Sequence, residues 1–315
     1  MLIKSKTSTL SHFLTMHALD AEKITYLLNR GEYFLKEVIA KQKVLDTLRG
    51  RVIANLFFEP STRTRNSFEI AEQRLGAIVL SPTMNQSSTV KGELLIDTLR
   101  NLQATGVALF VIRHSDNNLA QFLSAELHSG AAIINAGDGS NEHPTQALLD
   151  LMTIKQNIKH FSTLSIAIVG DVKHSRVAHS LICGLETLGT PEIRIVMPKN
   201  LMGDQFDISS NVKVFHDINA GLKDVDIVYA LRTQKERMPK TEHPDDDQYF
   251  KQFGITTDRL ALAKSDAIVM HPGPMNRGIE IESAVADGPQ SVILQQTRNS
   301  VAIRMAIIEA LLVAH

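Results

Sequence analysis

The sequence predicts an α/β protein of two doubly wound domains, each with a central parallel sheet flanked by helices. Short apolar runs bounded by turn residues alternate with longer stretches of helical period along the chain, as in parallel strands joined by helical crossovers. Within the runs, apolar residues occupy consecutive positions, which is typical of strands covered on both faces. The length of 315 residues fits two domains of about 100 to 200 residues each.

The strands are expected in regular succession. Seven apolar runs fit them, at residues 51–58, 107–113, 131–136, 164–170, 193–197, 225–231 and 267–273. Helices are expected after Ser61, across 145–157 and from about Gln290 onward. This order of elements favours two sheets of four or so strands each.

Two later segments depart from this regular pattern. In the last helix, Arg304 and Glu309 interrupt an apolar run at helical spacing, which indicates an amphipathic helix packed on the body. The polar stretch 232–254 contains prolines and predicts a long loop. Its acidic run, Asp245 to Asp247, is expected to be a solvated face rather than a metal site.

The domain boundary is expected near Pro144, where a polar run interrupts the pattern of strands and helices. Residues 1–145 together with 291–315 are expected to form one domain, and residues 146–290 the other.

Composition excludes several classes of function. Lys and Arg total 33 against 34 Asp and Glu, a formal net charge of -1, so no overall field attracts nucleic acid or an anionic membrane. The single cysteine, Cys183, cannot form an intramolecular disulfide and favours a reducing compartment. Neither a leader-like N-terminus nor an uncharged apolar run of about 18 residues is present. We therefore expect a cytoplasmic protein with no nucleic-acid or membrane partner.

Polar clusters follow six of the expected strands. They begin after Phe58, Ile112, Ala136, Val169, Leu231 and Met270. In parallel sheets, ligands bind beyond the carboxyl ends of the strands. We therefore expect one active site, in the crevice between the two domains.

The cluster Ser61 to Arg65 reads Ser-Thr-Arg-Thr-Arg and stands where a strand meets a helix. A helix start exposes backbone N–H groups at the positive end of its dipole, and hydroxyl and guanidinium groups add directed donors. Each charge-assisted hydrogen bond contributes about 1.5 to 3 kcal/mol, so the run predicts a phosphate site that needs no metal. The alternative is a capped helix with surface arginines. For Arg65 taken alone, that alternative stays open.

Four motifs, in order, resemble those of the aspartate and ornithine carbamoyltransferase family: "STRTR" at 61–65, "HPTQ" at 143–146, "RTQKER" at 232–237 and "HPGP" at 271–274. "RTQKER" resembles the aspartate branch, and the cysteines and the serine-methionine-glycine stretch of the ornithine branch are absent. The resemblance implies transfer of the carbamoyl group of carbamoyl phosphate to L-aspartate. The products are N-carbamoyl-L-aspartate and phosphate, in pyrimidine (UMP) synthesis, and no cofactor is implied.

The same resemblance assigns site residues. Carbamoyl phosphate is expected to be bound by Ser61, Thr62, Arg63, Thr64, Arg113, His143, Gln146, Gly273 and Pro274, with a cis peptide bond before Pro274. The catalytic residues are expected to be Thr64, Arg113, His143 and Lys91. The aspartate site is expected to contain Lys91, Arg176, Arg232 and Gln234.

Ser87 and Lys91 resemble residues that the family inserts into the active site of the adjacent subunit. The resemblance therefore implies a homotrimer with shared active sites, and a larger assembly with regulatory or dihydroorotase-like chains stays open. It also makes 1–145 plus 291–315 the carbamoyl-phosphate-binding domain and 146–290 the aspartate-binding domain.

Other interpretations remain. Taken singly, His143, Lys91, Arg176 and Arg232 are ordinary surface or core residues. Carbamoyl transfer to ornithine or another amine requires an acidic pocket, and a non-catalytic subunit of the same fold has no need of converging donors. A nicotinamide-linked enzyme is a further alternative, but the run after Gly170 lacks the dinucleotide glycine spacing.

Overall fold

The structure, a computed structural model, describes residues 10–84, 92–127, 130–158, 160–201, 209–238 and 243–313. The chain forms two compact units, Met1–Met152 with Asn299–His315, and Thr153–Arg298. The chain passes from one unit to the other within α5 (Pro144–Asn157) and within α11 (Ile293–Leu312). These crossings lie later in the chain than the expected boundaries at 145 and 290, because each helix continues across the boundary.

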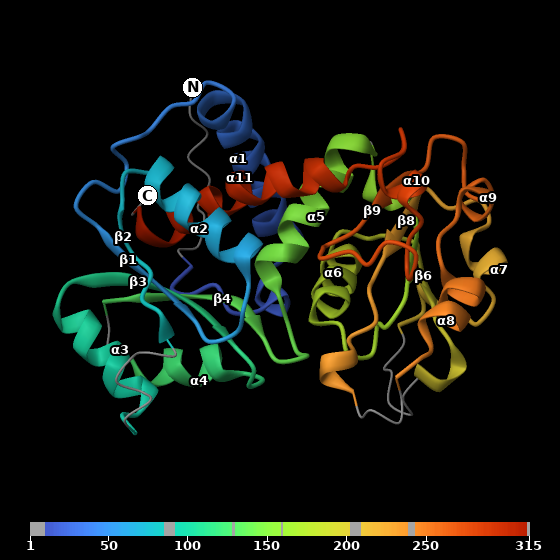
Figure 1. Ribbon diagram of the computed structural model, residues 1–315. Coiled ribbons are helices and arrows are strands. Elements are labelled where there is room, and N and C mark those ends of the chain that lie inside the picture. Colours follow the sequence, from blue (N-terminus) through green and yellow to red (C-terminus); the bar gives the residue numbers. More distant parts are fainter. Residues whose placement is uncertain are drawn as a thin grey trace. The chain divides into compact units, whose positions relative to one another are not determined.

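The first unit contains four parallel strands in the order β2-β1-β3-β4 (Figure 1). They are β1 (Val52–Phe57), β2 (Ile78–Leu80), β3 (Val107–His114) and β4 (Ala132–Asp138). The chain places β2 on one side of β1 and then β3 on the other. The direction of winding therefore reverses between β1 and β3, which is where such sheets bind ligands.

Helices cover both faces of this sheet. A buried apolar cluster joins the sheet to α3 (Leu95–Ala104) and α4 (Leu119–Glu126), with Leu56, Phe110, Leu99 and Leu123 among its members. Figure 1 places α1 (Ala21–Phe34), α2 (Thr62–Arg74) and α11 on the opposite face. Two short helical turns, η1 (Met16–Ala18) and η2 (Leu35–Ile39), flank α1.

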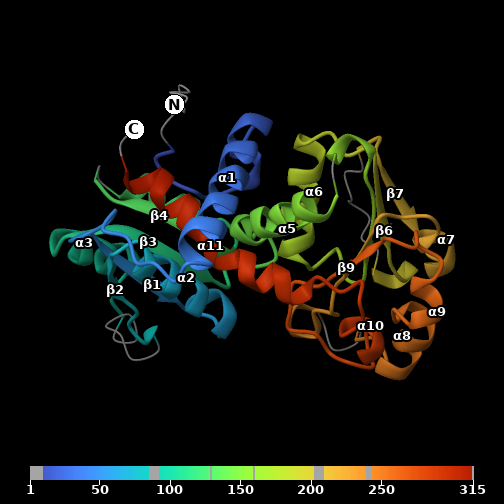
Figure 2. The same cartoon turned by 90° about the horizontal axis from the view of Figure 1, so that it is seen from above.

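The last helix differs from the expectation. From Ala302 to Glu309 every residue of α11 is buried, including Arg304 and Glu309, so the prediction of an amphipathic helix is wrong. Glu309 forms an ion pair with Arg30 on α1, and α1 lies beside α11 in the view from above (Figure 2). A periodic charge in the sequence does not distinguish a residue paired in the interior from one in water.

The second unit contains five parallel strands in the order β7-β6-β5-β8-β9. They are β5 (Ser165–Val169), β6 (Glu192–Val196), β7 (Val212–Phe215), β8 (Ile227–Ala230) and β9 (Ile268–Met270). Here the winding reverses between β5 and β8. The expected fold class and all seven expected strands are confirmed, whereas β2 and β7 were not predicted.

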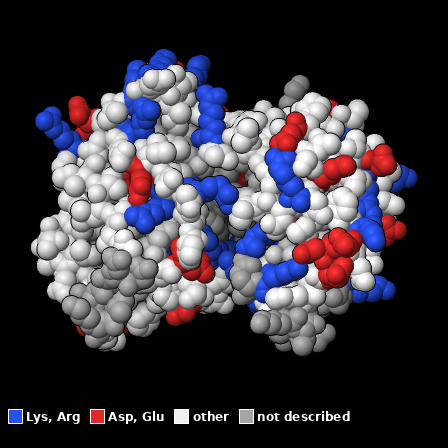
Figure 3. All heavy atoms as spheres, viewed as in Figure 1, with Lys and Arg blue, Asp and Glu red and all other residues white. Residues whose placement is uncertain are grey.

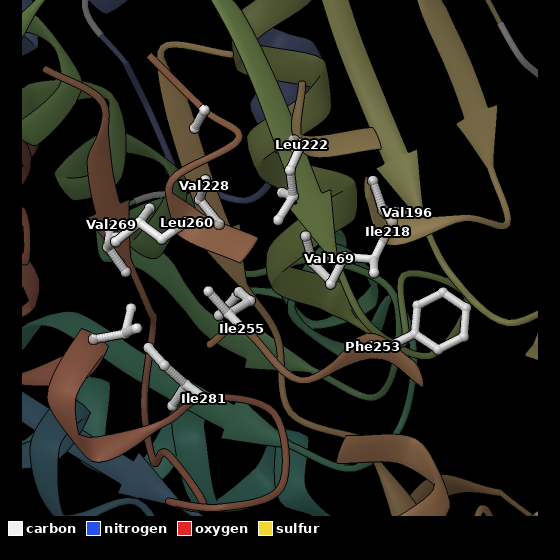
Figure 4. Close-up of a cluster of buried hydrophobic side chains, with 14 of the residues drawn as sticks. Val169, Val196, Ile218, Leu222, Val228, Phe253, Ile255, Leu260, Val269 and Ile281 are labelled. Atoms are coloured by element: carbon white, nitrogen blue, oxygen red, sulfur yellow. The ribbon is translucent and has the colours of Figure 1, made fainter. Parts of the chain in front are cut away.

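Apolar side chains fix the helices of this unit to its sheet. Val169, Val196, Val228 and Val269 of the strands join one buried cluster (Figure 4). The same cluster receives α7 (Ile218–Leu222), α8 (Asp246–Phe253), α9 (Thr257–Leu260) and α10 (Ser283–Ala286). The remaining helix is α6 (Arg176–Thr187), and the short turns are η5 (Phe161–Thr163), η6 (Lys199–Leu201) and η7 (Lys235–Arg237).

The stretch 232–254 was predicted to be a loop, and this is wrong from Asp246 onward, where α8 begins. The Asp245 side chain caps α8 by accepting from the backbone N–H of Gln248 at 2.9 Å. Asp246 pairs with Lys235 at 2.7 Å, and Asp247 is exposed. The acidic run therefore starts a helix, where aspartates cap N–H groups and oppose the dipole.

Acidic and basic side chains are interspersed over the face drawn in Figure 3, as the balanced composition leads one to expect. In the described part of the chain, no helix combines the length and the apolar character needed to span a bilayer.

Candidate active site

The start of α2 lacks the side-chain cap that other helices of the protein have. Ser61 is the N-cap residue, yet its side chain makes no capping hydrogen bond. In α1, α6 and α8, by contrast, the corresponding Asp20, Ser175 and Asp245 each accept from a first-turn amide. The Ser61 side chain therefore does not compete with an anion for the N–H groups at this helix start.

The hydroxyl and guanidinium side chains at the start of α2 differ in exposure and in their contacts. Thr62 and Arg63 are exposed, whereas Thr64 is buried. Arg65 turns aside: its Nε lies 2.9 Å from Glu69 Oε1, and its Nη2 donates to the Ser81 carbonyl oxygen at 2.9 Å. These contacts favour a structural role for Arg65 over a role as a phosphate ligand.

Arg113 stands at the end of β3, on the other side of the winding reversal. Its Nη1 donates to the Ala136 carbonyl oxygen at 3.3 Å, and its Nε lies 3.3 Å from Glu59 Oε2. The backbone N–H of Phe58 donates to the Arg113 carbonyl at 2.9 Å. Glu59 follows β1 and Ala136 belongs to β4, so contacts from both neighbouring strands hold the guanidinium at the same sheet edge as α2.

His143 lies in the turn between β4 and α5, and Gln146 lies in the first turn of α5. Asp138 shapes this turn, since its Oδ1 accepts from the Glu142 N–H at 3.1 Å and its Oδ2 from Asn118 N at 2.7 Å. Both His143 and Gln146 are buried. The Gln146 Nε2 donates to Asp150 Oδ1 at 3.1 Å, which leaves its carbonyl oxygen to accept from a ligand amide.

In the second unit, the ends of β5 and β8 meet closely. Gly170 has φ +133°, and a Cβ there would lie 2.5 Å from the Leu231 carbonyl oxygen. The buried Asp171 follows, and its carboxylate accepts from His174 Nδ1 at 2.9 Å and from the Gln234 N–H at 3.1 Å. One carboxylate thus fixes the loops after both strands.

These loops carry the predicted aspartate ligands. Arg176 is the first residue of α6 and is 2% exposed. Arg232 follows β8, and its Nη2 donates to Gln234 Oε1 at 3.3 Å. Arg237 Nη1 donates to the His174 carbonyl oxygen at 3.1 Å, which ties the two loops together a second time.

The loop after β9 contains the predicted cis peptide bond, Gly273–Pro274, and that prediction is confirmed. His271 orients this loop, because its Nδ1 accepts from the Gly273 N–H at 2.8 Å while its Nε2 lies 3.1 Å from Glu280 Oε1. His271 and Glu280 are both buried.

The structure brings the predicted residues together at the carboxyl ends of the strands within each unit: Ser61 to Thr64, Arg113, His143 and Gln146 in the first, and Arg176, Arg232, Gln234, Gly273 and Pro274 in the second. Ser87 and Lys91 lie outside the described residues. Across the residues that are described, no group of three or more His, Cys, Asp or Glu side chains is placed to hold a metal ion.

Two ionisable groups are buried behind the site in the first unit. Burial raises the pKa of Glu72 to about 8, against the opposing effect of Asn55 Nδ2, which donates to Glu72 at 2.7 Å. Burial also lowers the pKa of Arg304 to about 9, and the charge of Asp150 opposes that shift.

Two family models match the chain. Residues 11–156 match the carbamoyl-P binding domain of aspartate/ornithine carbamoyltransferases, and residues 162–311 match their Asp/Orn binding domain. The chain belongs to the aspartate/ornithine carbamoyltransferase family. The resemblance inferred from the four motifs is confirmed.

Among curated members of this carbamoyltransferase family, the aspartate carbamoyltransferase catalytic subunits of several Coxiella burnetii strains are 50% identical to this chain over 301 residues, or 96% of both chains. Aspartate transcarbamoylase of Trypanosoma cruzi, solved with carbamoyl aspartate and phosphate, has a TM-score of 0.88 at 30% identity and 99% coverage of both chains. The catalytic subunit of M. Jannaschii aspartate transcarbamoylase has a TM-score of 0.82 at 35% identity, over 96% of this chain and 98% of its own.

Two residues that hold site residues in place were not predicted from the sequence. Asp150 bonds to the Gln146 amide, and Asp171 bonds to the backbone N–H of Gln234. For Asp171 a signal existed, since an aspartate directly after an apolar strand is seldom solvated. Asp150 lay within a helical pattern and gave none.

Proposed function

We propose that the chain transfers the carbamoyl group of carbamoyl phosphate to the amine of L-aspartate, giving N-carbamoyl-L-aspartate and phosphate for pyrimidine synthesis. It is a carbamoyltransferase. The observation that carries the assignment is the placement of cationic side chains at both winding reversals: Arg113 beside the start of α2, and Arg176 with Arg232 after β5 and β8. Relatives 50% identical over 96% of the chain bear the name of this activity.

The first unit is assigned to carbamoyl phosphate. The N–H groups at the start of α2, with Ser61, Thr62, Arg63 and Thr64, bind the phosphate group. Gln146 accepts from the carbamoyl NH2, and the backbone carbonyls of the Gly273 and Pro274 loop accept from the same group. The first of these assignments is supported by the Ser61 side chain that caps nothing.

The reaction needs positioning and charge stabilisation rather than a covalent nucleophile. The neutral amine of aspartate attacks the carbonyl carbon, a C–N bond forms, and the C–O bond to phosphate breaks as the amine loses a proton. Negative charge develops on the carbonyl oxygen, where Thr64, Arg113 and His143 are assigned as donors. Preorganised donors of this kind each contribute about 100- to 1000-fold in rate.

The second unit is assigned to aspartate. The two carboxylates of aspartate match the forked guanidinium donors of Arg176 and Arg232. The Gln234 side chain accepts a hydrogen bond from Arg232. A cationic amine such as ornithine requires the opposite charge, which disfavours that alternative. That the groups of both units serve one crevice stays a prediction.

We also propose a homotrimer in which Ser87 and Lys91 complete the site of the adjacent subunit. Support comes from the region around residues 85–91: the outermost strand β2 exposes Ile78 and Leu80, and Leu94 is 66% exposed. These apolar side chains precede and follow that segment in the sequence, and a second copy of the chain would cover them. A cytoplasmic location is in keeping with a single cysteine, Cys183, which can form no disulfide within the chain.

The test is product formation. Purified protein supplied with carbamoyl phosphate and L-aspartate is expected to release phosphate and form carbamoyl-aspartate in equal amounts, and L-ornithine is expected to give no product. Arg113→Ala, expected to lose about 100- to 1000-fold in rate, controls for a contaminating enzyme. Product from ornithine would favour the other branch, and no product from any amine would favour a non-catalytic subunit.

A further inference from the structure

The buried guanidinium of Arg304, on α11, lies behind the candidate carbamoyl phosphate site. Arg304 is 2% exposed, and every other residue from Ala302 to Ile308 on this helix is apolar and buried. We propose that Arg304 is a positioning residue, which holds the start of α2 and the amide of Gln146 in the orientation that carbamoyl phosphate requires. This inference rests on the proposed function, because it concerns the same site.

The first link runs to α2. Arg304 Nη1 donates to Ser67 Oγ at 2.5 Å, and the guanidinium lies 4.7 Å from the ring centre of Phe68. The Ser67 hydroxyl in turn bonds to the carbonyl oxygens of Arg63, at 2.7 Å, and Thr64, at 2.8 Å. Those two carbonyls belong to the first turn of the helix, whose N–H groups and hydroxyls are assigned to the phosphate.

The second link runs to α5. The charge of Asp150, which is fully buried, acts on Arg304, and Asp150 Oδ1 accepts from Gln146 Nε2 at 3.1 Å. A buried carboxylate without a cation nearby is strongly disfavoured. The Arg304 charge therefore offsets part of the cost of burying the Asp150 carboxylate, whose Oδ1 holds the Gln146 amide.

Simple packing does not explain an arginine at this position. Burial lowers the pKa of Arg304 to about 9, so its charge is held at a cost, and its Nε has no hydrogen-bond partner among the described residues. A well-packed apolar side chain is often at least as stabilising as a buried ion pair. What an apolar residue lacks is a directed donor to Ser67 and a charge for Asp150.

The experiment compares two substitutions on the contacts of one helix. Arg304→Met is expected to raise the Kd of carbamoyl phosphate, measured by titration calorimetry, at least about tenfold, with a smaller change in the KM of aspartate. Arg30→Met removes the ion pair of α1 with Glu309 on the same α11. It is expected to lower the Tm and leave the Kd of carbamoyl phosphate unchanged.

Ser67→Ala, which deletes one hydroxyl, keeps the proposal testable if Arg304→Met fails to fold. It is expected to weaken carbamoyl phosphate binding in the same direction. An unchanged Kd in Ser67→Ala, an unchanged Kd in a folded Arg304→Met, or an equal loss in Arg30→Met would overturn the proposal. Failure of the proposed function is distinguished from these results, because it appears in the unsubstituted protein as absence of carbamoyl-aspartate.

Discussion

At the scale of single residues, Arg232 carries most of the argument for aspartate over other amines. It follows β8, contacts Gln234, and is only partly buried, so it can be replaced without leaving a large cavity. A bidentate guanidinium to carboxylate pair is lost in Arg232→Ala, and each charge-assisted bond contributes about 1.5 to 3 kcal/mol.

Arg232→Ala is therefore expected to raise the KM of aspartate by about 10- to 100-fold and to leave the Kd of carbamoyl phosphate near its original value. Initial rates at saturating carbamoyl phosphate measure the first quantity and calorimetry the second. Arg298→Ala, which removes an exposed arginine of the same unit, is the matched control. Equal weakening of both substrates by Arg232→Ala would contradict the assignment.

Glu72 predicts a pH dependence of stability. Its pKa is about 8 in the folded protein and near the ordinary value of 4.5 when unfolded, so the folded state keeps a proton that the unfolded chain releases. The contribution of Glu72 to the free energy of unfolding is therefore complete below about pH 4.5. It is lost as the pH rises to about 8, at up to about 1.4 kcal/mol per pH unit.

Glu72→Gln keeps an acceptor for Asn55 but cannot ionise. Thermal unfolding is expected to show a higher Tm for this variant than for the unsubstituted protein at pH 8, with the difference shrinking toward pH 5. Glu22→Gln, at an exposed position of α1, controls for the change in net charge. A constant difference across this pH range would contradict the prediction.

At the scale of elements, the close approach of β5 and β8 makes Gly170 indispensable. An added Cβ would meet the Leu231 carbonyl at 2.5 Å, and φ is +133°, so Gly170→Ala has both a clash and backbone strain. Gly189 also has a positive φ, +76°, but nothing lies within 4 Å of its Cβ position. Comparing alanine substitutions at the two glycines therefore separates the cost of backbone strain from the cost of the steric clash.

Gly170→Ala is expected to destabilise the protein by more than Gly189→Ala, for which a cost of about 1 to 2 kcal/mol applies. It is also expected to raise the KM of aspartate, because the loops with Arg176 and Arg232 start at these strand ends. Denaturant unfolding and steady-state kinetics check the two effects. Similar free energies of unfolding for both variants would show that the strands separate without cost.

What the sequence could predict about these elements depended on burial. The seven strands that were predicted are apolar on consecutive positions because both of their faces are covered. The strands that escaped, β2 and β7, are outermost, and Ile78 and Leu80 of β2 are exposed. A three-residue strand held mainly by backbone hydrogen bonds leaves little periodicity to detect.

The site could be predicted in part for a similar reason. Residues directly after a strand, such as Arg113 and Arg232, are placed by the strand itself, so local sequence located them. Arg304 and its partner Ser67 are 237 residues apart along the chain. Only the packing of α11 on α2 brings them together. The same packing turned an apparently amphipathic helix into a buried one.

At the scale of the whole molecule, the two units repeat one plan. In each, the first strand of the sheet, β1 or β5, lies beside the winding reversal, and the helix after it starts with the anion-binding candidates, Thr62 or Arg176. The chain thus provides separate supports for a phosphate and for a dicarboxylic amino acid. The proposed trimer adds Ser87 and Lys91 of the adjacent subunit to these two supports.

A shared active site predicts that two inactive variants recover activity when their subunits are mixed. Lys91→Ala and Arg113→Ala are each expected to lose most activity as pure proteins, at about 100-fold or more for the arginine.

If Lys91 acts in the neighbouring site, a mixed trimer contains sites that combine an intact Arg113 with an intact Lys91. After mild dissociation and reassembly of equal amounts, about one quarter of all sites should be whole, since the interfaces of a cyclic trimer are head-to-tail. Activity near that fraction, measured as carbamoyl-aspartate formed, supports the shared site. If Lys91 serves its own subunit, every site keeps one defect, and mixing restores nothing.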